Sequence, residues 1–157
     1  MTTSQAIVPS PLGPLRLTER GGALTCVDFA RDTTGAHASA ATPLLQSVRQ
    51  QLAAYFAGEL RQFDLPLDPT GTTFQRRAWL ELANIPYGEV LTYGELAARL
   101  GSGARAVGGA CGTNPIPIIL PCHRVVAAAG RIGGYSGADG TASKHFLLSL
   151  EAAHRAI

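Results

Sequence analysis

The sequence predicts a chain in two parts, a small α/β part followed by a mainly helical one. Short β-prone stretches are confined to the first 30 residues, whereas helix-start signals followed by apolar residues at helical spacing fill the second half. Between them, "FDLPLDPTGT" alternates apolar and polar residues and then turns, so we place a linker there. The expected domains are residues 1–70 and 71–157.

The first part is expected to be a small antiparallel meander followed by one helix. The β-prone stretches 5–8, 15–18 and 24–29 are separated by "SPLGP" and "RGG", which are turn sequences. Thr42 and Pro43 form a helix start, with the threonine as N-cap and the proline in the first turn, and Gly58 ends the helical pattern. The stretch "TTGAHASAA" before this helix is expected to be a loop.

The second part opens with two candidate capping boxes, one at Thr72 and Gln75 and one at Thr92 and Glu95. The second box starts the short helix "YGELAARL", which Gly101 ends, and "ARAVGGACG" predicts another helix almost at once. Two short helices joined by a glycine-containing turn are the outline of a helix-turn-helix. The pattern alone favours an ordinary pair of packed helices.

The helix predicted for "ARAVGGACG" has an unusual composition. Adjacent glycines each weaken a helix by roughly 1 kcal/mol relative to alanine, and one use of such positions is to let a large partner approach the backbone. Arg105 is the only long side chain in this helix. The small residues are Ala104, Ala106, Gly108, Gly109 and Ala110.

Composition excludes several classes of protein. With 157 residues, 46% apolar and 15% charged, the chain has enough apolar side chains for an ordinary core. No run approaches the roughly 20 apolar residues that span a bilayer, and "MTTS" starts no signal peptide, so we expect a cytoplasmic protein with no membrane partner. Residues 72–157 hold eight basic against five acidic side chains, which is compatible with a polyanionic partner.

The cysteines are expected to be reduced thiols. Cys26, Cys111 and Cys122 make an odd count without an export signal. No CxxC or HxxxH pair is present, so we expect neither a metal site nor a cofactor. Cys111 is interpreted as a packing residue.

The stretch "LPCHRVV" holds the candidate nucleophile. Asn114 breaks the preceding helix, "IPIIL" is expected to be a buried strand-like run, and Cys122 follows where Pro121 stops it. A free cysteine is most often a small buried apolar residue. Here His123 is adjacent, Arg124 adds positive potential, and the glycine-rich "GRIGGYSG" follows, which favours a reactive thiol.

A nucleophilic Cys122 needs a base and a group that orients the base. Neighbouring residues of an extended chain point to opposite faces, so a turn or a bridging water must bring Cys122 and His123 together. Glu151, on the amphipathic stretch "SKHFLLSLEAAH", is the candidate orienting group. Its alternative, a solvated carboxylate on a helix face, is the one that the residues alone favour.

Five stretches closely resemble, in order and spacing, the O6-alkylguanine-DNA alkyltransferases. They are "GTTFQRRAW", "IPYGEVLTYGELA", "ARAVGGACGTNPIPIILPCHRVV", "GGYSG" and "KHFLLSLE", and they span residues 71–151. The opening "SPLGPL" is similar to the family's weaker N-terminal pattern. One departure follows "YS", where many relatives have two glycines and this chain has Gly137 and Ala138.

The resemblance implies a fold and a function. The fold is an α/β N-terminal lobe, a small antiparallel sheet plus helix that is ribonuclease H-like, with a mainly helical C-terminal lobe containing a winged helix-turn-helix. Such proteins bind double-stranded DNA through the minor groove, flip out O6-alkylguanine or O4-alkylthymine and move the alkyl group irreversibly onto a cysteine. They need no cofactor, and we expect a monomer in the absence of DNA.

The resemblance also implies a role for each matching residue. Cys122 is the acceptor, His123 draws off its proton through a water, and Glu151 orients His123. Asn114 supports the turn around the thiol, and Tyr93 assists rotation of the nucleotide and hydrogen-bonds the base. Arg105 replaces the flipped base in the stack. The other residues expected to contact DNA are Ala104, Gly108 and Gly109, together with Tyr93. The substrate pocket is expected to contain Tyr135, Ser136, Val125 and Lys144, with Lys144 near its rim.

Three rival functions remain. A non-catalytic lesion-binding protein would share the fold, but such relatives lack the cysteine that Cys122 provides. A helix-turn-helix regulator would suit the basic excess, yet a glycine-rich recognition helix offers few side chains for reading base edges. A cysteine hydrolase with a Cys–His dyad would turn over repeatedly, whereas an alkylated thiol has no evident route to regeneration in this sequence.

Overall fold

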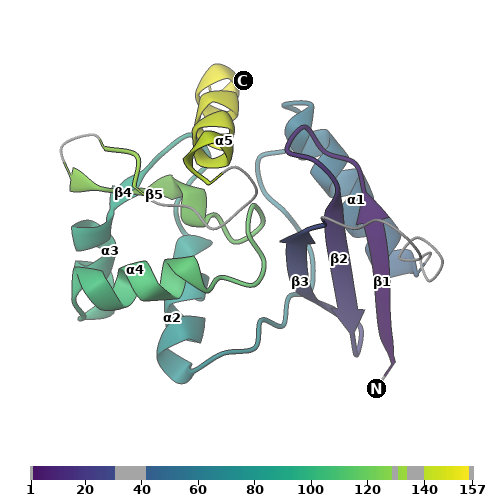
Figure 1. Ribbon diagram of the computed structural model, residues 1–157, viewed down its shortest axis with the longest axis horizontal. Coiled ribbons are helices and arrows are strands. Elements are labelled where there is room, and N and C mark those ends of the chain that lie inside the picture. The colour runs from purple at the N-terminus through teal and green to yellow at the C-terminus, as the bar shows by residue number, and fades with distance from the viewer. Residues whose placement is uncertain (1, 31–41, 129–130, 134–139, 156–157) are drawn as a thin grey trace. The chain divides into compact units, whose positions relative to one another are not determined.

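The computed structural model describes residues 2–30, 42–128, 131–133 and 140–155. The chain divides into two compact units, Met1–Thr70 and Gly71–Ile157. Figure 1 shows a sheet with one helix in the first unit and mostly helices in the second. Among the described residues, no helix has both the length and the apolar character needed to cross a membrane. The loop predicted for "TTGAHASAA" falls outside the described residues.

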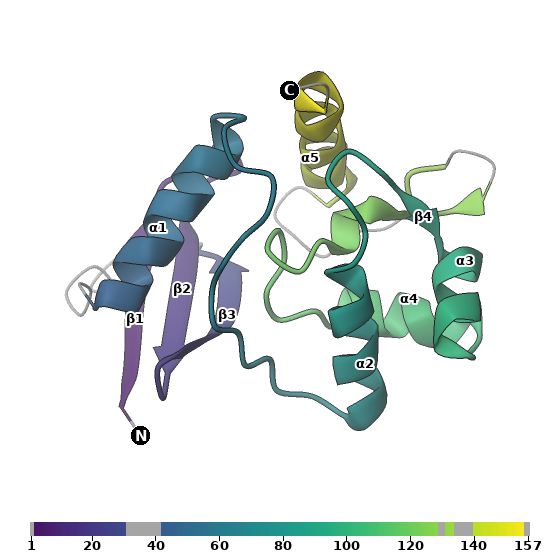
Figure 2. The same ribbon diagram turned by 180° about the vertical axis from the view of Figure 1, so that it is seen from behind.

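The first unit confirms the predicted meander and helix. Strands β1 (Thr3–Val8), β2 (Leu15–Arg20) and β3 (Ala23–Phe29) form one antiparallel sheet in that order. Helix α1 (Pro43–Phe56) lies along one face of the sheet (Figure 2). The Thr42 side chain accepts a hydrogen bond from the Leu45 amide and so caps α1, as the sequence predicts.

The expected linker is more ordered than predicted. The Leu24 amide donates to the Pro66 carbonyl and the Asp68 amide to the Leu24 carbonyl, each at 2.9 Å. Leu67 therefore pairs in parallel with Leu24 on β3, an edge strand of the sheet. An unpaired strand edge leaves backbone donors and acceptors without partners, which explains why this segment is held against it.

The second unit is mainly helical. Its helices are α2 (Thr73–Leu82), α3 (Tyr93–Leu100), α4 (Ala104–Gly112) and α5 (Thr141–His154), and its short segments are β4 (Leu91–Thr92), the 3-10 helix η2 (Cys122–Arg124) and β5 (Val125–Val126). Both predicted capping boxes are present, at the starts of α2 and α3. Gly101 ends α3 in the left-handed region, with φ of 64°. Only residues 101–103 separate α3 from α4, so the helix-turn-helix outline is present, while the wing stays a prediction.

A two-residue parallel pairing joins the helix pair to the segment that carries the thiol. Leu91 pairs with Val125 and Thr92 with Val126. Thr92 is also the N-cap of α3, so this pairing fixes the start of that helix next to η2 and β5. Figures 1 and 2 both show α3 and α4 side by side below this pairing.

The prediction of a strand-like run for "IPIIL" is wrong. Residues 116–120 form a turn that the Leu120 amide closes by donating to the Ile116 carbonyl at 2.9 Å. The side chain of Asn114 supplies backbone hydrogen bonds that a neighbouring strand would otherwise make. It accepts from the Ile116 amide at 3.0 Å and donates to the Leu120 carbonyl at 2.8 Å. Ile118 has φ of 75°, unusual for a β-branched residue, so the surrounding contacts hold the turn in a strained conformation.

Candidate active site

Cys122 is the first residue of η2 and is only 5% exposed. Its amide donates to the Leu120 carbonyl at 2.8 Å, so the turn that Asn114 supports also holds the thiol. Burial raises the pKa of Cys122, while a hydrogen bond from Asn114 and the charge of Lys144 act in the opposite direction. The net shift is upward, so the thiol keeps its proton until a base removes it.

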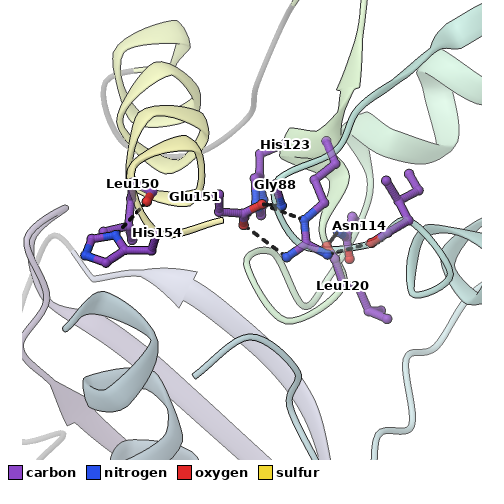
Figure 3. Close-up of polar contacts among 9 residues, drawn as sticks. Gly88, Asn114, Leu120, His123, Leu150, Glu151 and His154 are labelled. Carbon is purple, nitrogen blue, oxygen red and sulfur yellow. Dashed lines mark hydrogen bonds and ion pairs between the residues drawn. The ribbon is translucent and has the colours of Figure 1, made fainter. Parts of the chain in front are cut away.

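The structure brings together His123 and Glu151. His123 Nε2 and Glu151 Oε2 are 2.6 Å apart, and the two side chains are 0% and 1% exposed. Glu151 projects from α5 toward His123 and Gly88, which come from separate segments (Figure 3). The alternative of a solvated carboxylate for Glu151 is wrong.

Glu151 is also paired with Arg124, which the sequence analysis considered only as a source of positive potential. Arg124 Nε donates to Glu151 Oε1 at 2.8 Å and Nη2 donates to Oε2 at 3.0 Å. Its Nη1 donates to the Ile85 carbonyl at 2.7 Å, and the guanidinium lies 5.7 Å from the centre of the Tyr87 ring. The amide of Gly88 gives Glu151 a further hydrogen bond, at 3.1 Å.

These donors determine the charge of the carboxylate. Burial by itself raises the pKa of Glu151, but the hydrogen bonds and charges of His123 and Arg124 hold it well below its usual range. Glu151 is therefore an anion that can only accept hydrogen bonds. Two of these partners lie in short motifs of the sequence, Gly88 in "PYG" and Arg124 in "CHR". Neither motif by itself indicates a contact with residue 151, which is far away in the chain.

The ionised Glu151 decides which nitrogen of His123 carries the proton. Because the carboxylate only accepts, Nε2 must donate, and in the neutral ring Nδ1 then keeps its lone pair. Burial lowers the pKa of His123, with Arg124 and Lys144 adding to this and Glu151 opposing it. Nδ1 is buried and has no hydrogen-bond partner among the described residues. The arrangement is a neutral imidazole with a free basic nitrogen, oriented by an anion.

Lys144 lies deeper than the expected pocket rim. Its side chain is 0% exposed, and Nζ donates to the Val125 carbonyl at 2.6 Å. Nζ is also 5.6 Å from the centre of the Tyr93 ring, which places Lys144 between two of the expected site residues. Burial lowers the pKa of Lys144. Tyr135 and Ser136, also expected in the pocket, lie outside the described residues.

Four of the five residues expected against DNA lie on α4, and the fifth, Tyr93, is the first residue of α3. Ala104, Arg105 and Gly109 are exposed, and Gly108 is half-buried. A Cβ atom built on Gly108 or Gly109 would meet no atom of the described residues within 4 Å, which leaves the backbone of this helix open to a partner. Cys111, on the inner side of α4, is buried, and burial raises its pKa to about 12, consistent with a packing role.

The chain matches two family models along most of its length. Residues 73–153 match the 6-O-methylguanine DNA methyltransferase, DNA binding domain, and residues 5–69 match its ribonuclease-like domain. A methylated-DNA–protein-cysteine methyltransferase from Mycobacterium tuberculosis is 47% identical over 149 residues, covering 92% of this chain and 89% of that protein. One from Methanosarcina acetivorans is 44% identical, covering 93% and 96%.

Solved structures agree with these matches. The crystal structure of Mycobacterium tuberculosis OGT in complex with DNA has a TM-score of 0.85 and 45% identity, covering 96% of this chain and 94% of that one. An O6-methylguanine DNA methyltransferase from Methanococcus jannaschii has a TM-score of 0.69 and 29% identity, covering 93% and 92%. The chain belongs to the 6-O-methylguanine DNA methyltransferase family and is an enzyme of the methylated-DNA–protein-cysteine methyltransferase class.

Proposed function

We propose that this protein moves the O6-alkyl group of a guanine in duplex DNA onto Cys122, and acts on O4-alkylthymine in the same way. The observation that carries the proposal is the unpartnered Nδ1 of His123, whose Nε2 is held by Glu151, in the residue that directly follows the buried Cys122. A base in this state accepts the Cys122 proton through a bridging water. In this proposal residues 1–70 form a scaffold domain, and residues 71–157 form the domain that binds DNA and carries out the transfer.

The transfer is a displacement at the alkyl carbon. The Cys122 thiolate forms the new C–S bond as the bond from the alkyl carbon to O6 breaks, and the departing oxygen takes up negative charge that hydrogen-bond donors stabilise. We assign Tyr93, Ser136 and Tyr135 to binding of the base, and Val125 and Lys144 to the same substrate pocket. The product is a thioether on Cys122, and we expect each molecule to react once.

Duplex DNA is proposed to bind through its minor groove to α4, with the protein a monomer before binding. The small residues Ala104, Gly108 and Gly109, of which Gly108 is half-buried and the others exposed, let the sugar-phosphate backbone approach closely. Arg105 fills the gap that the flipped nucleotide leaves. The DNA complex of the Mycobacterium tuberculosis relative supports a DNA partner.

The direct test is intact mass after incubation with duplex DNA containing O6-methylguanine. We expect a gain of one methyl group per protein molecule, absent in Cys122→Ala and retained in Cys111→Ala. Cys122→Ala should still bind the DNA. Methylation that persists in Cys122→Ala, or repeated turnover by the parent protein, would contradict the proposal.

Arg105→Ala tests flipping separately from chemistry. Because unstacking a base is unfavourable by a few kcal/mol, the variant should react with duplex DNA slower by roughly one to three powers of ten. The free base O6-benzylguanine needs no flipping, so its reaction with the variant should keep nearly the parent rate. Equal losses on DNA and on free base would show that Arg105 has a structural role instead.

A further inference from the structure

Helix α4 has few stabilising features of its own. Gly103 supplies no side-chain cap, the first turn has no acidic residue and the last turn has no basic one. Gly108, Gly109 and Gly112 weaken it further, because glycine disfavours a helix interior. The last carbonyls of any helix also need partners from outside. The orientation of the end of α4 must therefore be fixed by its neighbours.

Helix α2 and Thr113, the C-cap residue of α4, supply these partners. The buried Trp79 Nε1 donates to the Ala110 carbonyl at 2.9 Å. Thr113 Oγ1 lies 3.1 Å from the Gly109 carbonyl and 3.2 Å from the Ala110 carbonyl, to either of which it donates. Gln75 Nε2 in turn donates to Thr113 Oγ1 at 3.2 Å. Figures 1 and 2 both show α4 lying across α2.

The Gln75 amide is itself held in one orientation. Its Oε1 accepts from the Thr72 amide at 2.8 Å as part of the capping box, which turns Nε2 toward Thr113. Gly71 packs closely over the same group, since a Cβ there would lie 2.7 Å from Gln75 Oε1 and 2.5 Å from the Trp79 ring. The capping box at the start of α2 therefore also orients the Gln75 Nε2 donor toward Thr113, at the end of α4.

Thr113 is also the last residue before the turn that holds the thiol. Asn114 follows it directly and binds both ends of residues 116–120, and Leu120 accepts from the Cys122 amide. We propose that Gln75, Thr113 and Trp79 form a brace that fixes the exposed face of α4 relative to Cys122. All three are positioning residues, and the inference rests on the proposed function, in which duplex DNA lies on α4.

The brace predicts a selective defect. Thr113→Val keeps the shape of the side chain but removes Oγ1, and Thr113→Ser is the matched control that keeps it. Loss of one hydrogen bond should reduce the rate with duplex O6-methylguanine DNA by about five- to tenfold, with the O6-benzylguanine rate within about twofold of the parent. Thr113→Ser should react like the parent with both. Equal loss with both substrates, no loss with DNA, or a serine variant as slow as the valine variant would overturn the inference.

Amide hydrogen exchange without DNA separates this inference from the proposed function. Thr113→Val and Trp79→Phe should each exchange the amides of residues 108–113 faster than the parent by roughly the same five- to tenfold, because the last turn opens more often. Thr113→Ser should exchange like the parent. If the parent protein fails to take up a methyl group, the proposed function is wrong and this exchange still judges the brace. Unchanged exchange in both variants would overturn it.

Discussion

The two units differ in what they bury. Among the described residues of the first unit, the buried side chains are apolar or aromatic. Most of them belong to the three strands and to α1. In the second unit, the core holds charged and polar groups as well. The buried apolar and aromatic residues of the first unit are Val8, Leu15, Leu17, Leu24, Val27, Ala30, Leu45, Val48, Leu52 and Tyr55, and the polar ones of the second are Asn114, His123, Arg124, Ser143, Lys144 and Glu151.

This difference teaches how each unit responds to change. Apolar burial has no preferred direction, so a core such as that of the first unit tolerates repacking. A buried charge is tolerated only when its partners stay in place, because its hydration has been lost. The stability of the second unit therefore depends on the hydrogen bonds that His123 and Arg124 make with Glu151. The proposed chemistry depends on the same contacts.

Arg124→Met should have the largest effect. Glu151 would remain buried without its guanidinium partner, which destabilises a protein by about 3–5 kcal/mol. Trp79, the single tryptophan of the chain, lies buried in the second unit, so its fluorescence during urea unfolding reports on that unit. The control is Arg99→Met, whose pair with Glu81 at 3.6 Å is partly exposed and contributes about 0–1 kcal/mol. Equal losses in the two variants would mean that the buried ion pair of the second unit is no more sensitive than a partly exposed one.

Leu52→Ala tests the opposite side of the comparison. Leu52 is 2% exposed in the core of the first unit, and a cavity there should cost about 3 kcal/mol. We expect the rate of Cys122 alkylation by O6-benzylguanine to stay at the parent value below the unfolding temperature, measured by intact mass against time. A slower reaction in the folded variant would mean that the first unit shapes the site.

Gly88→Ala should have a smaller effect on stability and a clear one on rate. Gly88 has φ of 78°, and an added Cβ would lie 2.9 Å from the Arg155 Cβ, so the amide that binds Glu151 must move. We expect a loss of about 2 kcal/mol and slower alkylation. Gly101→Ala is the control, because φ is 64° there but nothing lies within 4 Å. It should lose about 1 kcal/mol and keep its rate, and a similar rate loss in both would contradict the role of Gly88.

The smallest expected effect is on pH dependence. The pKa of His123 is lowered by burial, so between that pKa and the unfolded value of about 6.5 the unfolded chain holds a proton that the folded chain lacks. Stability therefore falls as pH falls below about 6.5, by less than about 1.4 kcal/mol per pH unit. Glu151, with its pKa lowered, contributes fully above about pH 4.3 and loses that contribution only at lower pH.

His123→Gln should flatten the stability curve between about pH 7 and pH 5, because it removes a histidine whose pKa is lowered by folding. Urea midpoints followed by Trp79 fluorescence give the comparison. An unchanged slope would mean that His123 is not held neutral in the folded protein.

Structural features that depend on residues close together in the chain were predicted well. The N-cap at Thr42 and the boxes at Thr72 and Thr92 depend on residues three positions apart, so the sequence contains both partners in one short stretch. The left-handed end of α3 at Gly101 is equally local. His123 and Glu151 were candidates from the residues alone, and the resemblance to the family then favoured them as partners over a solvated Glu151.

Interactions that follow no such local pattern, and those across long separations, could not be predicted in this way. The apolar run 116–120 has the same composition in a buried turn as in a buried strand, and the side chain of Asn114, which decides between them, acts on residues two and six positions away. Arg124 lies next to His123 in sequence, but its pairing with Glu151 spans 27 residues. The same holds for Lys144, whose burial depends on Val125 and Tyr93.

The sharing of Glu151 has a consequence for the order of folding. Glu151 and its partners Gly88, His123 and Arg124 come from three separate segments, so no short stretch of chain can form the cluster alone. A chain in which α5 has not yet docked must keep Arg124 and Glu151 hydrated, because burying either one unpaired is strongly unfavourable. The closing of these loops and the loss of water from both charges must then occur in one step. The helix that orients the base is thus also the element whose docking completes the folding of the second unit.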